Sequence, residues 1–203
     1  MTPKSEKQNQ IIRDERRDQI LDHAMRLFTQ KGYSATKISD IAQSAALSQG
    51  LVYHYFASKE EMFIAVVEQT IELSNDAMNR LSSMPLEPSE KMRAITEANL
   101  GFEDTGGYAL RWLLMFQVGL TNSVPKRARD LMKERFVSLE FVKAIIEEGQ
   151  RKGQFSSKKE ASSLATAYWS LIEGLVFFKA LNTSDLGWTV SMPDVETVMK
   201  ILQ

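Results

Sequence analysis

Apolar side chains recur every three or four residues through most of this 203-residue chain, and no segment alternates apolar and polar residues as a strand does. The periodicity therefore predicts an all-α fold. Gly, Pro and polar clusters interrupt the pattern and divide it into about nine helices. We expect these over 13–31, in two short segments between 36 and 56, in a long segment opening at 58, and over 89–104, 108–121, 125–152, 159–182 and 193–203.

Capping signals organise the first part of the chain. Gly32 suits the position after a helix, and Thr36 and Ser48 each suit the N-cap of a short helix. Ser58, with Glu61 three residues later, forms a capping box that opens the long helix. Two short helices separated by a tight turn predict a helix-turn-helix, whose second helix enters the DNA major groove by its N-terminal end.

The second short helix should divide its residues between packing and recognition. Its apolar anchors are Leu47, Val52 and Phe56, facing Ile38, Ile41 and Ala42 of the first. The residues left outside this packing are Gln49, Gly50, Leu51, Tyr53, His54 and Tyr55.

These outward residues suit two kinds of DNA contact. Gln49 can pair bidentately with adenine, Leu51 can meet a thymine methyl group, and Gly50 lets the backbone approach closely. Phosphate oxygens suit the side chains of Thr36, Tyr53, Tyr55 and Lys59. A Tyr-His-Tyr-Phe run is equally typical of packing between helices, so the pattern alone leaves that interpretation open.

Composition excludes several kinds of site. The chain has no Cys and only two His, His23 and His54, so thiolate chemistry, disulfides and multi-histidine metal sites are excluded. There is no Gly-rich phosphate loop and no nucleophile elbow. We therefore expect no catalytic residues, no metal and no cofactor, and predict that the chain is not an enzyme.

Charge and hydropathy bear on partners and compartment. Residues 1–60 carry nine Lys or Arg against seven Asp or Glu, and residues 61–203 carry sixteen against nineteen, so the net charge of −1 conceals only a small N-terminal excess of positive charge. The first ten residues lack the apolar core of a secretory signal. The longest apolar stretch, 108–120, is shorter than the roughly 20 residues of a membrane span. We expect a cytoplasmic protein without a membrane partner.

The stretch from Ile20 to Phe63 resembles the DNA-binding domain of the tetracycline-repressor (TetR) family of bacterial regulators. The shared residues, in unbroken order, are Ile20, Leu21, Ala24, Leu27, Phe28, Gly32, Tyr33, Thr36, Ile41, Ala42, Ala45, Ser48, Gly50, Tyr53, His54, Tyr55, Phe56, Ser58, Lys59, Glu60, Met62 and Phe63. By this resemblance the DNA contacts fall on Thr36, Lys37, Ser48, Gln49, Gly50, Leu51, Tyr53, His54, Tyr55 and Lys59. One departure is Ala46, where the family usually has Gly; a positive φ there costs about 1 kcal/mol.

The resemblance also implies a division of labour. We expect a DNA-binding domain over 13–60 and an effector-binding and dimerisation domain over 61–203, joined by the long helix. The C-terminal likeness is weaker and rests on the run from Ile145 to Phe155 and on Glu173-Gly174-Leu175. In the family the last two long helices form the dimer interface, which here implies Leu164, Tyr168, Leu171, Ile172, Leu175, Phe178, Val195, Val198, Met199 and Leu202. Such an apolar series is also typical of a simple core.

Members of this family generally bind a small-molecule effector among the C-terminal helices. The candidate lining combines aromatic, Met and polar residues. It comprises Phe102, Glu103, Trp112, Met115, Phe116, Gln117, Met132, Phe136, Glu140, Tyr168, Trp169, Glu173 and Phe177. The acidic members favour a cationic or hydroxyl-bearing ligand, with an apolar ligand left open.

Together these features predict a ligand-responsive regulator, a repressor, that binds a palindromic DNA operator as a homodimer and is released by its effector. The first alternative is a helical binding or adaptor protein of the same fold that does not bind an operator, and the second, which the composition disfavours, is an enzyme. The sequence does not identify the effector, the operator or the genes regulated.

Overall fold

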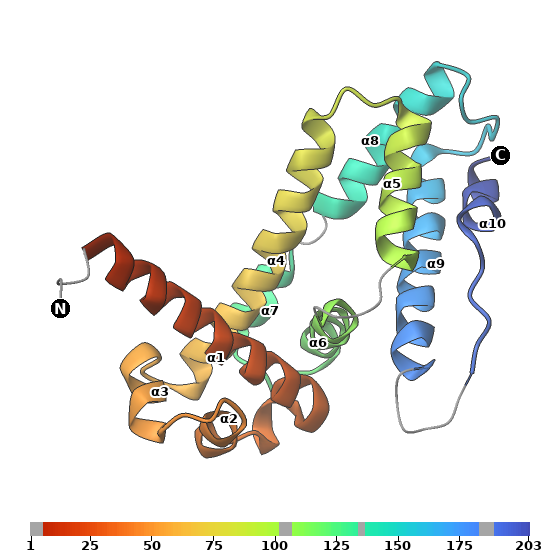
Figure 1. Cartoon of the computed structure of the whole chain (residues 1–203). Coiled ribbons are helices and arrows are strands. Elements are labelled where there is room, and N and C mark those ends of the chain that lie inside the picture. Colours follow the sequence, from red (N-terminus) through yellow and green to blue (C-terminus); the bar gives the residue numbers. More distant parts are fainter. Residues whose placement is uncertain (1–5, 102–106, 134–136, 183–188) are drawn as a thin grey trace. The chain divides into compact units, whose positions relative to one another are not determined.

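The computed structural model describes residues 6–101, 107–133, 137–182 and 189–203. Within these ranges the chain forms ten α-helices and no strand, which confirms the all-α prediction. In order they are α1 (Glu6–Ala35), α2 (Ile38–Ser44), α3 (Gln49–Tyr55), α4 (Lys59–Ser83), α5 (Pro88–Leu100), α6 (Tyr108–Leu120), α7 (Lys126–Leu131), α8 (Val137–Arg151), α9 (Ala161–Asn182) and α10 (Val195–Met199), with a final 3-10 turn over Lys200–Leu202 (Figure 1).

Packing divides the chain into two units. Unit 1 contains Met1–Thr70 and Leu113–Met132, and unit 2 contains Ile71–Trp112 and Lys133–Gln203. These units reflect which residues pack together, whereas the division into 13–60 and 61–203 is one of function and stays a prediction.

Aromatic rings hold the core of unit 1 together. Phe28 and Tyr33 of α1 both pack edge-on against Phe63 of α4, with ring centroids 4.9 and 4.8 Å from it. Gln117 of α6 adds a polar contact, since its Nε2 donates to the carbonyl oxygen of Thr29 at 2.9 Å. Residues of α1, α4 and α6 thus pack together in unit 1, which also contains α2 and α3.

The two ends of α1 differ from their predictions in different ways. The predicted stop at Gly32 is a kink: Gly32 leaves the helical conformation with φ 79° and ψ 160°, and the helix then continues to Ala35. The chain is already helical at Glu6, the first described residue, whereas the prediction begins at 13. Residues 7–19 are exposed and lack the buried stripe that periodicity detects, so the pattern does not predict all of this part of the helix. The predicted cap at Thr36 is wrong by one residue: the N-cap of α2 is Lys37.

The single helix expected over 125–152 is also wrong. Helix α7 ends at Leu131, with Met132 as its C-cap, and α8 begins at Val137. No Gly or Pro stands between Leu131 and Val137, so the usual breakers gave no signal of this end.

The core of unit 2 joins α5, α8, α9 and α10. A polar pair lies within it, since the hydroxyls of Thr96 and Tyr168 are 2.8 Å apart, and burial raises the pKa of Tyr168. Gly149 of α8 permits the close approach of Phe155, because a Cβ at position 149 would lie 2.2 Å from that ring. This contact folds the chain back after α8 within the run that resembles the family.

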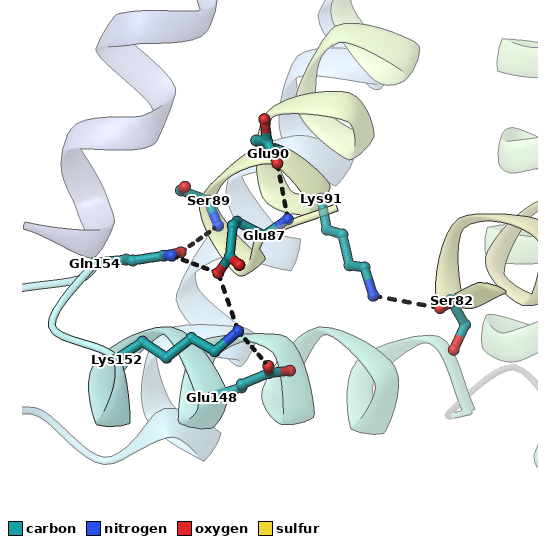
Figure 2. A network of polar contacts seen from close by, with 8 residues as sticks. All are labelled: Ser82, Glu87, Ser89, Glu90, Lys91, Glu148, Lys152 and Gln154. Atoms are coloured by element: carbon teal, nitrogen blue, oxygen red, sulfur yellow. Dashed lines mark hydrogen bonds and ion pairs between the residues drawn. The ribbon is translucent and has the colours of Figure 1, made fainter. Parts of the chain in front are cut away.

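A polar network fixes the start of α5 to the end of α8 (Figure 2). Glu87, the N-cap of α5, accepts hydrogen bonds from Lys152 Nζ at 3.0 Å and from Gln154 Nε2 at 2.7 Å. The same ammonium pairs with Glu148 at 3.0 Å. The hydrogen bond from Lys152 holds the pKa of Glu87 below its ordinary value.

One helix among the described residues is long and apolar enough to cross a membrane by length and composition, namely the segment Ala161–Lys179 of α9. Core helices of globular proteins pass the same test, and Ala165, Tyr168 and Ile172 of α9 are fully buried in unit 2. Only 33% of the segment is buried, however, so part of its apolar surface faces outward.

Candidate functional site

Helices α2 and α3 form the helix-turn-helix that the capping signals predict. Helix α2 packs against both α1 and α3 (Figure 1). Val52 and Phe56 are buried, as are Ile38 and Ile41 on α2, and Leu47 is half-buried in the turn. The predicted anchors of α3 therefore do face the interior of unit 1.

The turn between the two helices has a strained residue followed by a good cap. Ala46 has φ 53°, the left-handed conformation in which a side chain costs about 1 kcal/mol relative to Gly. Ser48 is the N-cap of α3, as predicted, and its Oγ accepts a hydrogen bond from the backbone N–H of Leu51 at 3.2 Å. The cap fixes where α3 begins and hence which residues point outward.

The outward face of α3 carries polar and aromatic side chains. Tyr53 is 49% exposed and Leu51 37% exposed, and Tyr55 is half-buried. The exposed residues that sequence analysis assigned to DNA are Lys37, Ser48, Gln49, Gly50, Leu51, Tyr53 and His54. Lys37 is the N-cap of α2, Ser48 is the N-cap of α3, and the other five residues lie on α3.

Helix α4 begins with the predicted capping box. Ser58 Oγ accepts from the N–H of Glu61 at 3.0 Å, and the Glu61 carboxylate accepts from the N–H of Ala57 at 2.7 Å. The reciprocal bond thus reaches one residue further back than the standard motif. It fixes the connection between α3 and α4.

The ammonium of Lys59, for which a phosphate contact is predicted, is hydrogen-bonded within unit 1. It donates to the carbonyl oxygens of Tyr33, Ser34 and Thr36 at 2.9, 3.3 and 3.0 Å, and it lies 4.5 Å from the centroid of the Tyr33 ring. An ammonium has three hydrogens. All three hydrogens of the ammonium therefore take part in hydrogen bonds that join the start of α4 to residues 33–36.

Thr36 is likewise turned inward. Its side chain is fully buried, and its hydroxyl lies 2.8 Å from the carbonyl oxygen of Gly32 and 3.2 Å from that of Leu27. The predicted contact between this hydroxyl and phosphate does not fit this arrangement, because the hydroxyl is buried and donates to carbonyl oxygens at the end of α1.

One contact of the site escaped sequence analysis. The guanidinium carbon of Arg17 lies 5.2 Å from the centroid of the Phe56 ring, at the C-cap of α3. The two residues are far apart in the chain, and neither capping nor periodicity relates them. Only the fold brings the exposed part of α1 to the end of α3.

The predicted effector residues are dispersed. Phe102, Glu103 and Phe136 lie outside the described residues. Unit 1 holds Met115, Phe116, Gln117 and Met132, and unit 2 holds Trp112, Glu140, Tyr168, Trp169, Glu173 and Phe177. Of these, Trp112, Met115 and Tyr168 are buried, whereas Phe116, Glu140 and Phe177 are exposed.

The predicted dimer residues divide between core and surface. Those buried within unit 2 are Leu164, Tyr168, Ile172, Leu175, Val198, Met199 and Leu202. Val195 is half-buried, and Leu171 and Phe178 are each 37% exposed. The residues of α9 that remain exposed from Ser162 to Phe178 carry no charged side chain.

Comparison with known proteins supports the helix-turn-helix directly. Residues 20–66 match the model of the family described as bacterial regulatory proteins, tetR family, and this segment contains all of α2 and α3. The chain belongs to the TetR family.

Relatives of this TetR-family chain are named as transcriptional regulators. The HTH-type transcriptional regulator BetI of Paraburkholderia xenovorans is 28% identical over 84% of the chain and 85% of its own length. The HTH-type transcriptional activator FasR of Mycolicibacterium smegmatis is 32% identical over 50% of the chain and 48% of its own length. The chain is therefore a transcriptional regulator, in agreement with the prediction that it is not an enzyme.

Solved structures share the fold. A transcriptional regulator from Saccharomonospora viridis, solved in complex with choline, has 24% sequence identity and a TM-score of 0.69, covering 93% of this chain and 94% of that one. AibR, solved with isovaleryl coenzyme A and operator DNA, has 16% identity and a TM-score of 0.66, covering 91% and 94%. At these identities the likeness establishes the fold alone.

Proposed function

We propose that this TetR-family regulator is a cytoplasmic homodimer that binds a palindromic DNA operator through α3, represses transcription there, and is released by a small-molecule effector. The outward face of α3 carries the proposal. A helix anchored by Val52 and Phe56 and started by the Ser48 cap holds Gln49, Gly50 and Leu51 at its exposed N-terminal end. That end is the part of a recognition helix that reaches base edges.

Base reading is assigned to the first turn of α3. Gln49 offers the paired donor and acceptor that match adenine, and Leu51 offers an apolar contact for a thymine methyl group. Gly50 has open space where a side chain would stand, so the DNA can approach its backbone. These three residues would set the sequence preference.

Phosphate contacts are assigned to the exposed residues Lys37, Ser48, Tyr53 and His54 and to the half-buried Tyr55. Thr36 and Lys59 are assigned a positioning role instead, because their polar groups are bonded within unit 1. This assignment changes two members of the set that the sequence suggests.

Dimerisation is assigned to the exposed face of α9. Ala167, Leu171, Gly174 and Phe178 follow one another at intervals of three or four residues, so they share one side of the helix. A partner helix that covers this uncharged side would bury Leu171 and Phe178. Two copies would then present two α3 helices to a palindromic operator, with half-sites about 34 Å or a multiple apart.

The effector is proposed to bind among the C-terminal helices, with the aromatic residues Trp112, Tyr168 and Trp169 of unit 2 as lining candidates. Aromatic faces suit a cationic ligand, and one structural neighbour is solved with choline. Another is solved with isovaleryl coenzyme A, so the two compounds form a contrasting pair for thermal-shift measurements. A ligand that binds only the folded chain at about 100 times its Kd stabilises it by about 2.7 kcal/mol. If neither choline nor isovaleryl coenzyme A raises the melting temperature, neither compound is a ligand of this chain.

The DNA-binding proposal is tested by selecting duplexes from a randomised pool with the purified full chain. The expected result is an enriched sequence with two inverted half-sites. Gln49→Ala should change or relax the enriched sequence, and Gln30→Ala, the same change at an exposed position of α1, should leave it intact. Failure of the wild-type chain to enrich any sequence would favour the alternative of a binding protein without an operator.

The dimer is tested by sedimentation of Leu171→Glu/Phe178→Glu, which we expect to be monomeric. Leu120→Glu, at a leucine that is 80% exposed on α6, is the matched control and should leave the dimer intact. A dimeric double variant would contradict the assignment to α9. A reporter gene behind the selected operator, measured with and without the regulator, tests repression against activation.

A further inference from the structure

The N-terminal part of α1 is exposed on every side. From Lys7 to Gln19 each residue is exposed, and the first turns of α1 point away from α2 and α3 in Figure 1. Contacts with α3 and α4 begin only at Arg17 and Asp18, near the end of this segment. At 1.5 Å per residue it extends about 20 Å beyond the first buried residue, Ile20. A helix that projects so far contributes little to the core of unit 1.

Its charges are segregated by side. Arg13, Arg16 and Arg17 are spaced so that they share one side of the helix, and the buried Ile20 and Ala24 continue the same line. The arginines thus occupy the direction that faces the core further along the helix. We call them the arginine face.

The acidic residues Asp14, Glu15 and Asp18 lie on the other sides of the helix. Asp14 accepts a hydrogen bond from Gln10 at 2.9 Å, and Asp18 accepts one from Gln69 of α4 at 3.0 Å. Asp18 therefore marks the side of α1 that faces α4.

The arginine face is oriented by a different contact. The guanidinium of Arg17 lies over the ring of Phe56 at the C-cap of α3. A contact of this kind also attracts the cation electrostatically to the ring. The arginine face is therefore continuous with the end of the recognition helix, whereas the acidic side is turned toward α4.

We propose that the arginine face binds backbone phosphates of the DNA that flanks the base pairs read by α3. The inference rests on the proposed function, since it presumes that α3 occupies the major groove. Guanidinium groups suit phosphate because their five N–H donors match its oxygens. Arg16 donates to Gln19 through one nitrogen and has further N–H groups for a phosphate. Ile11 and Ile12 are neighbours in sequence and point about 100° apart, so they do not form the apolar stripe that a helical protein partner requires.

The test is the salt dependence of binding to a duplex of mixed sequence, about 30 base pairs or roughly three helical turns long, measured with the full chain by fluorescence anisotropy. The variant Arg13→Gln/Arg16→Gln should make the slope of log K against log salt shallower by about 1.8, since each phosphate contact contributes about 0.9. Arg17 is left unchanged because it also packs on Phe56. Sequence preference on selected duplexes should stay as in the wild type, because phosphate contacts are common to all sequences.

The control is Arg26→Gln, which removes the same charge from an exposed position about 15 Å further along α1 than Arg16. Its slope should equal that of the wild type. The proposal is overturned if the double variant keeps the wild-type slope, or if Arg26→Gln shifts the slope as much as Arg13→Gln alone does. A change in oligomeric state with an unchanged slope would mean that the face contacts another copy of the chain. Absence of any DNA binding by the wild-type chain would instead overturn the proposed function, and this inference with it.

Discussion

Helices α3 and α9 each bury one side in the core of their unit, yet the sequence distinguishes the two sides of α3 much better than those of α9. In α3 the inward residue is Val52, with Phe56 at the C-cap, and the outward residues are polar, aromatic or Gly apart from Leu51, so residue type indicates the side for all but one position. In α9 apolar residues occupy both sides: Ile172 is buried in unit 2, and its neighbour Leu171 is exposed. Periodicity finds an apolar face but does not say what covers it.

The largest effect expected from this comparison is in α3. Phe56→Ala removes a buried ring and should lower the free energy of unfolding by about 3–5 kcal/mol. Tyr53→Ala, at a residue that is about half exposed, should change stability by no more than about 0.5 kcal/mol while weakening DNA binding. Chemical denaturation and anisotropy on the same samples check both expectations. Equal losses of stability in the two variants would mean that the faces of α3 are misassigned.

A second pair sharpens the comparison in α9. Ile172→Ala should destabilise the chain by about 2–5 kcal/mol at every protein concentration, because it leaves a cavity in the core of unit 2. Leu171→Ala should lower the melting temperature mainly by weakening association, so its effect should depend on protein concentration. Melting curves over a wide concentration range separate the two. A Leu171→Ala effect independent of concentration argues against a partner on that face.

A Lys59 variant tests whether this residue positions α4, as we propose, or contacts phosphate, as the sequence predicts. Lys59→Met keeps an unbranched apolar stem and removes three hydrogen bonds to carbonyl groups, so it should cost about 1–3 kcal/mol of stability. The slope of DNA affinity against salt should remain near the wild-type value. A wild-type melting temperature combined with a shallower slope of DNA affinity against salt would show that Lys59 contacts phosphate.

The contrast between Ser48 and Lys59 shows which contacts can be predicted from sequence. The Ser48 cap, the capping box at Ser58 and the break at Gly32 depend on residues within a few positions, so local rules predicted them. The partners of Lys59 lie 23 to 26 residues away, and its three bonds depend on how α1 and α4 pack.

In unit 2 the apolar periodicity predicted the helices but not their contacts. The pairing of Tyr168 with Thr96 spans 72 residues. In unit 1 the end of α7 at Leu131 likewise has no Gly or Pro beside it, so the neighbouring residues do not predict it.

A smaller effect is expected in the turn that precedes α3. Ala46→Gly should raise the free energy of unfolding by about 1 kcal/mol, because Gly adopts φ near +53° without a Cβ clash. The control is Ala35→Gly near the end of α1, an exposed position where the same change should not stabilise. A destabilised Ala46→Gly variant would show that the turn is not strained.

The smallest effect is expected in the network at the start of α5. Because Lys152 lowers the pKa of Glu87 in the folded chain, this pair contributes stability above the ordinary carboxyl pKa of 4.5 and loses it as pH falls through the lowered folded value. In the Lys152→Gln variant the melting temperature should therefore fall less between neutral and acidic pH than in the wild type, with little change in DNA binding. The same pH profile in wild type and variant would dismiss the contribution of this pair.

The claim that α3 reads base sequence is tested most directly by the ratio of the dissociation constants for a scrambled and a selected duplex. For Gln49→Ala this ratio should fall about 5- to 150-fold, corresponding to about 1–3 kcal/mol for a bidentate contact, whereas for Gln30→Ala it should equal the wild-type ratio. A Gln49→Ala chain that binds DNA with the wild-type ratio would contradict the account.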